Sequence, residues 1–457
     1  MKKYIGDRVF YKTVLMLALP LILQNTLTNF VNLLDNLMVG QTGTEQMSGV
    51  SIVNQILFVY NLCLFGGTSG AGIFAAQFYG KKDSDGVRAC LRFNIIVVTV
   101  FTVLALLVFS LFGTPLISSF LHDDGQSDLA ATLAAGQGYI TIMLFGLPAF
   151  AVTNAYTGIL RGAGEPNVPM KASIAALLVN LCGNWVLIFG HLGFAPMGVR
   201  GAAIATVLSR YVEAGMVLRL AKKSPNCGYA EGILRHFSIP APLLKRIAVK
   251  SLPLLCNEFF WSLGQTLLTQ SYSLRGLTAI AALNINSVVT MVCSVVSASL
   301  GNCVGIVLGN ELGSGDFDRA RRDCPRLTAL SVFAGAVTSL LLVILAPLVP
   351  RFYNTTDAVR SLSVQLALVC AAMEPFMAYT NSAYFALRSG GRTEITVIFD
   401  SAFSWAVMVP LAWVLSRKTA LPLLVIFFAV NATNIIKSVF GAVLLKKGVW
   451  IRNIVSE

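Results

Sequence analysis

The stretch "LPLILQNTLTNFVNLLDNLMVG", residues 19–40, combines the length and apolar character of a membrane-spanning helix with a row of polar side chains. Asn25, Thr28, Asn32 and Asp35 follow one another at steps of three or four residues, so they share one face of a helix. A carboxylate at the centre of a membrane costs about 3 kcal/mol unless it faces water or a partner. We therefore expect this face, and Asp35 above all, to line a hydrated space between helices.

Apolar runs of similar length recur along the whole chain of 457 residues, which is 56% hydrophobic and only 12% charged. A helix needs about 20 apolar residues to cross the hydrocarbon region of a bilayer. The sequence therefore predicts an all-α integral membrane protein with 12 transmembrane helices. The predicted spans are residues 11–38, 49–79, 90–112, 136–160, 168–190, 200–220, 246–272, 279–312, 327–349, 362–387, 394–416 and 421–445.

The basic residues are unevenly distributed between these spans, and the net charge is +13. If the N-terminus lies inside, most Lys and Arg residues, Lys437 among them, fall in inner segments. This is the positive-inside bias, which predicts a multi-pass protein of the cell membrane with both termini in the cytoplasm. The partners expected are therefore the lipid bilayer and small molecules, with no nucleic acid, and we expect a monomer.

An internal repeat relates the two halves of the chain. At a fixed offset along the sequence, Gly80 and Asp83 in the first half match Gly313 and Asp316 in the second. Six spans return the chain to the side where it started, so the halves form two parallel six-helix repeats, an arrangement that places a binding cavity near the midplane between them. The predicted domains are an N-lobe (1–221), a cytoplasmic linker (222–245) and a C-lobe (246–457).

Several polar groups inside the predicted spans are not duplicated by the repeat: Asp35 corresponds to Leu268, and Glu258 corresponds to Asn25. Asn180 and Asn184 lie one turn apart in the fifth span, and Glu258 and Gln265 share a face of the seventh. Asp400 lies in the eleventh span, where a carboxylate again suggests a functional role. In the sixth span Arg210 and Glu213 are three residues apart, and we expect them to pair with each other.

The nine cysteines are scattered without a CxxC spacing, and we predict no metal site and no cofactor. The sequence contains no HExxH or GxSxG motif and no paired intramembrane histidines, so it is not expected to be an enzyme. A channel would need repeated ring-forming filter segments, which a single six-plus-six repeat does not supply. These exclusions favour a secondary active transporter.

A series of segments resembles the multidrug and toxic compound extrusion (MATE) family, NorM-like branch. Besides residues 19–40, they include "AAQFYGKKD" (75–83), "GILRGAGEPNVPM" (158–170), "LPLLCNEFFWSLGQT" (252–266) and "FALRSGGRTEI" (385–395). The resemblance covers essentially the whole chain and implies the MATE/MOP-type transporter fold.

The resemblance implies an antiporter that exports amphipathic, often cationic, drugs and toxic compounds in exchange for H⁺ or Na⁺. It places a cation-coupling site at Asp35 with Asn180 and Asn184. Some relatives carry an aspartate where this chain has Asn184, so the site holds less negative charge here, which argues against sodium and leaves a proton suitable. Secondary coupling or substrate-binding positions are expected at Glu258, Asn32, Gln265 and Asp400.

One alternative is a lipid-linked precursor or metabolite flippase or exporter of the same superfamily. Such a protein usually has more spans or a strongly cationic central cavity. The inward-facing stripes here are acidic and amide-rich, which argues against a pyrophosphate cargo.

Overall fold

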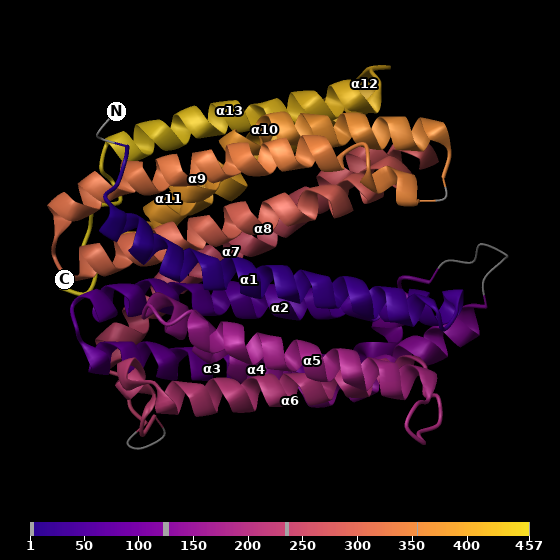
Figure 1. Cartoon of the computed structure of the whole chain (residues 1–457), viewed down its shortest axis with the longest axis horizontal. Helices are drawn as coiled ribbons and strands as arrows, with labels where there is room; N and C mark the ends of the chain where they lie inside the picture. The colour runs from indigo at the N-terminus through magenta and orange to yellow at the C-terminus, as the bar shows by residue number, and fades with distance from the viewer. Residues whose placement is uncertain (1–3, 122–127, 234–236, 354, 457) are drawn as a thin grey trace. The chain divides into compact units, whose positions relative to one another are not determined.

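The computed structural model describes residues 4–121, 128–233, 237–353 and 355–456, apart from the side chains of residues 292 and 293. It is built from long helices joined by short turns (Figure 1). The first half contributes six of them and a short 3₁₀ segment, η1 (Pro225–Ala230). The six helices are α1 (Arg8–Gly40), α2 (Thr44–Gly80), α3 (Ser84–Ser118), α4 (Leu129–Gly162), α5 (Asn167–Phe189) and α6 (Val199–Lys223).

The second half repeats this pattern with one difference, a run of π-helix in its fifth long helix. That helix spans residues 393–418 and is assembled from α11 (Thr393–Val397), η3 (Ile398–Ala402), η4 (Ser404–Met408) and α12 (Val409–Lys418). The other elements are α7 (Ala241–Ser273), α8 (Leu277–Gly313), α9 (Phe317–Leu345), η2 (Val349–Phe352), α10 (Asp357–Ser389) and α13 (Leu423–Lys446).

Within the described residues, 11 helices are long and apolar enough to cross a membrane. The one long helix outside this set is α7, which has 33 residues but carries several polar side chains, Glu258 and Gln265 included. Each of the twelve predicted spans coincides with a long helix, so the all-α, multi-span fold class is confirmed.

Two compact units make up the chain. The N-unit comprises Leu23–Ala75 and Asp83–Ala248, and the C-unit comprises Met1–Ile22, Ala76–Lys82 and Val249–Glu457. Helices α1, α2 and α7 therefore each contribute to both units. The predicted lobes assign all of α1 and α2 to the N-lobe, and that assignment stays a prediction; residues 234–236 of the predicted linker lie outside the described part of the chain.

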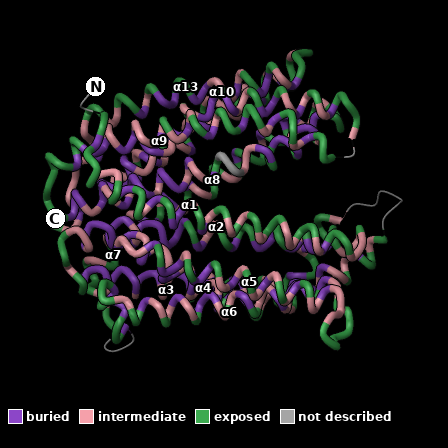
Figure 2. The backbone as a smooth tube through the Cα atoms, viewed as in Figure 1, coloured by how far each residue is buried: buried purple, intermediate pink, exposed green. Residues whose placement is uncertain are grey.

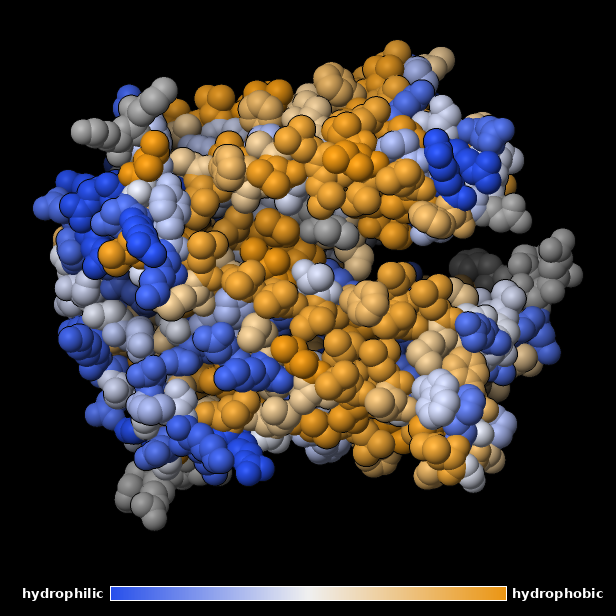
Figure 3. All heavy atoms as spheres, viewed as in Figure 1, coloured by the Kyte–Doolittle hydropathy of each residue, from blue (hydrophilic) through white to orange (hydrophobic). Residues whose placement is uncertain are grey.

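The N-unit is held together by pairwise packing of α3 on α4, α4 on α6 and α5 on α6 (Figure 1). Each helix is buried along one side and exposed along the other (Figure 2), as expected for helices that pack on one face and meet lipid on the opposite face. On α3, for example, Leu104, Leu107 and Leu111 are at least half exposed. Hydrophobic side chains cover the middle of the helices, and hydrophilic ones gather at their ends (Figure 3).

In the C-unit, α10 is the central helix and packs against α8, α9 and α13. One apolar cluster joins α7, α8, α10 and α13 through residues such as Leu268, Ala282 and Leu366. The other cluster takes in the start of α1, with Val14 and Leu21 beside residues of α8, α9 and α10. The first turns of α1 therefore form part of the core of the C-unit.

Repeat-related residues make a reciprocal contact within the C-unit, where the end of α2 meets the end of α8. A side-chain carbon on Gly80 would overlap the backbone carbonyl of Asn310, and one on Gly313 would overlap that of Gln77. The partners exchange roles under the same sequence offset, as at a two-fold contact. Gly309 likewise faces Ala76, so these glycines allow the two helices to pack closely.

The repeat also conserves the start of the third helix of each half. Asp83 caps α3 by accepting a hydrogen bond from the Gly86 amide at 2.8 Å, and Asp316 caps α9 by accepting one from the Arg319 amide at 3.0 Å. Each carboxylate satisfies an amide that has no partner inside its helix.

Candidate functional site

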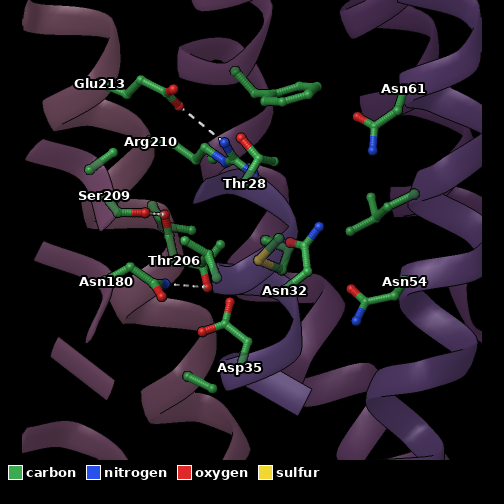
Figure 4. Close-up of a pocket in the computed structure, with 18 of the residues that line it drawn as sticks. Thr28, Asn32, Asp35, Asn54, Asn61, Asn180, Thr206, Ser209, Arg210 and Glu213 are labelled. Atoms are coloured by element: carbon green, nitrogen blue, oxygen red, sulfur yellow. Dashed lines mark hydrogen bonds and ion pairs between the residues drawn. The ribbon is translucent and has the colours of Figure 1, made fainter. Parts of the chain in front are cut away.

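A cavity of about 370 Å³ lies within the N-unit, enclosed by α1, α2, α4, α5 and α6. Its wall is mostly apolar, and the polar groups on it come chiefly from α1, α2 and α6 (Figure 4). The polar and charged residues that line it are Thr28, Asn32, Asp35, Asn36, Asn54, Asn61, Ser173, Asn180, Thr206, Ser209, Arg210 and Glu213.

Asp35 points into this cavity toward α5 and α6 (Figure 4). It accepts a hydrogen bond from Nδ2 of the fully buried Asn184. The same Nδ2 lies 3.2 Å from Asn180 Oδ1, and Asn180 in turn donates to Thr206 Oγ1 at 3.3 Å. The structure thus brings Asp35, Asn180 and Asn184 together, as the family resemblance implies, and it adds Thr206 to the chain of hydrogen bonds.

Two features leave this cluster open to a further ligand. Among the described residues Asp35 makes no ion pair, although Arg210 lines the same cavity. The side-chain oxygen of Asn184 is buried and has no hydrogen-bond partner in the described part of the chain. A buried acceptor of this kind costs free energy unless water or a bound ion satisfies it. A carboxylate beside an unpartnered amide oxygen has the chemistry of a site for a small hard cation or a proton.

The other charged groups that line the cavity, Arg210 and Glu213, form an ion pair with each other. Arg210 Nη1 lies 3.0 Å from Glu213 Oε2, which confirms the predicted pair. Ser173 donates to the second carboxylate oxygen of Glu213 at 2.8 Å and accepts from Gln24 at 3.0 Å. Gln24 accepts a hydrogen bond from Arg161 at 2.7 Å. This chain of contacts joins four helices and leaves Asp35 as the carboxylate of the cavity without a fixed cation.

Asn32 is exposed and lies on the cavity wall, as its spacing from Asp35 predicts. The spacing within α1 does not reveal the opposite wall, where Asn54 and Asn61 project from α2 (Figure 4). These two asparagines are seven residues apart on one face of a helix, and that periodicity is the sequence signal by which they could have been found.

The remaining candidates lie in the C-unit and do not form part of this cavity. Glu258 is half-buried on α7, whereas Gln265 is exposed two turns further along. Asp400 forms an ion pair with Lys437, whose Nζ lies 2.6 Å away. The count of Lys437 among the inner, membrane-flanking residues is wrong, because it lies within α13 and only 9% of it is exposed.

Within the described residues, no group of three or more His, Cys, Asp or Glu side chains could hold a metal ion. The chemistry of the cavity therefore comes from one carboxylate, several amides and hydroxyls, and the Arg210–Glu213 pair. Such a site can bind and release a cation, and it contains no arranged nucleophile and base.

Comparison with known proteins agrees with this description of a membrane transporter. The MatE family model matches residues 20–186 and 253–414, one match in each half. The chain belongs to this family, whose members are multidrug efflux transporters rather than enzymes.

Relatives and solved structures of the family cover almost the whole chain. "Probable multidrug resistance protein NorM" of Thermotoga maritima is 24% identical over 439 residues, covering 96% of this chain and 93% of that protein. Human "Multidrug and toxin extrusion protein 1" is 23% identical and covers 94% and 73%. A structure described as an outward-facing multidrug resistance MATE family transporter superposes with a TM-score of 0.85 at 18% identity, covering 98% of each chain. This likeness supports the MATE fold.

Proposed function

We propose that this protein is a cation-coupled antiporter that exports amphipathic, often cationic, small molecules across the cytoplasmic membrane. One observation supports this most directly: among the described residues Asp35 forms no ion pair, and it faces the cavity beside the unpartnered side-chain oxygen of Asn184. A single carboxylate neutralises one monovalent cation, and either H⁺ or Na⁺ fills that role.

The coupling follows from competition for one negative charge. An ionised Asp35 attracts a cationic guest into the cavity. When a proton or sodium ion from the opposite side neutralises the carboxylate, the hold on the guest weakens and it leaves. Phe58, Tyr139 and Phe150 line the same cavity and supply faces against which a flat cation can pack. Alternation of the cavity between the two sides of the membrane then produces antiport.

The orientation in the membrane belongs to the same proposal. The clustering of Lys and Arg in the inner segments supports cytoplasmic termini. With that orientation, export runs from the side where the chain begins and ends. Asn32 lies on the cavity wall and is proposed as a substrate contact. Glu258 and Gln265, on α7, are proposed as secondary contacts in the C-unit.

The test uses the purified protein in proteoliposomes loaded with ethidium, under an imposed pH gradient or sodium gradient. We expect one of the two gradients to drive export and Asp35→Asn to abolish that drive. A tenfold gradient of one coupled ion supplies about 1.4 kcal/mol, so it can sustain roughly a tenfold dye gradient, which Asp35→Asn should lose.

Asp85→Asn is the matched control, because Asp85 is an exposed carboxylate whose partner is a surface arginine, Arg88. It should transport like the unmodified protein. Gradient-driven export that persists at full rate in Asp35→Asn, with the protein folded, would rule out the proposed role of Asp35.

A further inference from the structure

In the C-unit, the membrane-helix carboxylate of Asp400 is mostly buried, and both of its oxygens are already occupied. Asp400 Oδ1 lies 2.6 Å from Lys437 Nζ, with the two side chains 18% and 11% exposed. The other oxygen accepts a hydrogen bond from Asn257 Nδ2 at 3.1 Å. Ser401 donates to Asn257 Oδ1 at 2.7 Å, which fixes the orientation of that amide. The ion pair therefore joins α13 to the π-helical segment η3, and Asn257 adds α7.

The backbone around Asp400 departs from a regular α-helix. It lies in η3, which is separated by one residue, Phe403, from a second π-helical segment, η4. Trp405 in η4 donates to the backbone oxygen of Phe260 on α7 at 2.9 Å, so side chains of this stretch bond to the neighbouring helix. Short π-helical stretches inside membrane helices are common at functional sites, because the extra residue per turn turns side chains toward a site.

The remaining titratable and charged groups around Asp400 come from α7 and α10. Glu258 follows Asn257 on α7, is half-buried, and makes no hydrogen bond or ion pair within the described residues. The charges that act on it are those of Arg388 and Asp400. On α10, the Tyr384 hydroxyl lies 3.4 Å from Asn257 Nδ2, and the Arg388 guanidinium lies 5.9 Å from the centre of the Tyr384 ring.

The charges in this cluster balance. Counted as ionised, the cluster contains two carboxylates, Asp400 and Glu258, and two cations, Lys437 and Arg388. A cluster without net charge has little attraction for a mobile cation, whereas the same cluster without the ammonium group of Lys437 has a net charge of −1. A buried ion pair is in general no more stabilising than well-packed apolar side chains, so stability alone does not account for a lysine inside a membrane helix.

We propose that Lys437 is a resident cation that occupies Asp400 and so keeps the C-unit from taking up a second coupling ion. In this role Lys437 lowers the number of ions exchanged for each substrate molecule, because it keeps Asp400 from binding a mobile cation. The inference rests on the proposed ion-coupled function and deepens it. In this arrangement Asp400 does not bind a mobile cation, because the ammonium group of Lys437 already occupies it.

The experiment counts the ions that cross the membrane for each ethidium exported from proteoliposomes, with a trapped pH dye for H⁺ and radioactive sodium for Na⁺. The protein as it exists should exchange about one monovalent cation per dye, because Asp35 is one carboxylate. Lys437→Met frees Asp400, and the ratio should then rise toward twice that of the unmodified protein. Lys437→Arg keeps a cation at the same position and should preserve the original ratio.

A second variant covers the outcome in which Lys437→Met fails to fold. Asp400→Asn with Lys437→Met leaves a neutral pair of similar shape, with no carboxylate at position 400 and no ammonium group at position 437. It should exchange ions in the original ratio. An unchanged ratio in folded Lys437→Met would overturn the proposal, and so would a lost ion requirement in the double variant, since Asp400 would then be a coupling group itself. If the unmodified protein exchanges no ion at all, the proposed antiport fails instead.

Discussion

Asp35 in the N-unit and Asp400 in the C-unit are held in similar ways and differ in what they are free to bind. Each carboxylate accepts a hydrogen bond from an asparagine of a neighbouring helix, Asn184 in one case and Asn257 in the other. Asp400 also has an ammonium group 2.6 Å away, whereas Asp35 has no ion pair among the described residues and faces a cavity of about 370 Å³.

From this contrast we infer that a carboxylate inside a membrane is available to a mobile ion when no tethered cation already neutralises it. A negative charge needs compensation in an apolar surrounding, and it takes it from the nearest available source. For Asp400 that source is covalently part of the protein, in α13. For Asp35 the proposed source is an ion or guest that enters the cavity.

The largest expected effect is a loss of stability when Asp400 is changed. Asp400→Asn leaves the buried ammonium group of Lys437 without its partner, and breaking such a pair costs about 3–5 kcal/mol. Asp35→Asn strands no buried cation, so it should lower stability far less. Thermal unfolding in detergent measures both, and the melting temperature should fall clearly only for Asp400→Asn.

The double variant Asp400→Asn with Lys437→Met is the control for this loss of stability. It removes both charges and should recover most of the melting temperature. Equal melting temperatures for Asp400→Asn and Asp35→Asn would show that the two carboxylates share the same electrostatic situation, contrary to the comparison.

A change at Asn184 tests whether sodium binds at Asp35. Asn184→Asp places a second carboxylate against the first and replaces the donor Nδ2 by an acceptor. Two adjacent carboxylates attract a sodium ion more strongly than one, and about 1.4 kcal/mol of added attraction corresponds to a tenfold change in affinity. We expect sodium to support ethidium export at roughly a tenth of the concentration that the unmodified protein needs.

Asn54→Asp is the matched control for the added charge. Asn54 lines the same cavity from α2, on the wall opposite Asp35 (Figure 4). A similar sodium response in both variants would mean that the cavity responds to its total charge and that no local ion site exists at Asp35.

The sequence predicts the polar cluster around Asp35, but it does not predict the pairing of Asp400 with Lys437. Asp35, Asn180 and Asn184 are recognisable because each lies in an apolar run and because helical spacing places the two asparagines one turn apart. The contact between α1 and α5 depends on packing across 149 residues of chain, which no local spacing encodes. The resemblance to a transporter family supplied that link.

The pairing of Asp400 with Lys437 was not predicted, for a physical reason. A lysine near the end of an apolar run usually extends its amine to the membrane surface, so its position alone suggests an inner, solvated residue. The two residues are 37 apart on consecutive long helices, and only the packed structure shows Lys437 buried against Asp400. The helices themselves were predictable, because apolar length sets them.

The smallest expected effect concerns a feature that the two halves share, the aspartate cap of the third helix. Asp83 and Asp316 cap the third helix of each half with hydrogen bonds of 2.8 and 3.0 Å. Loss of such a cap costs about 1 kcal/mol, so Asp83→Ala and Asp316→Ala should lower the melting temperature by small and similar amounts. Asp83→Asn and Asp316→Asn, which keep a capping oxygen, serve as controls and should change it less. A large difference between the melting temperatures of the two alanine variants would mean that the two caps contribute unequally to stability. Similar changes in melting temperature would mean that the two caps are equivalent, in contrast to the membrane-buried charges on which the proposed ion coupling depends.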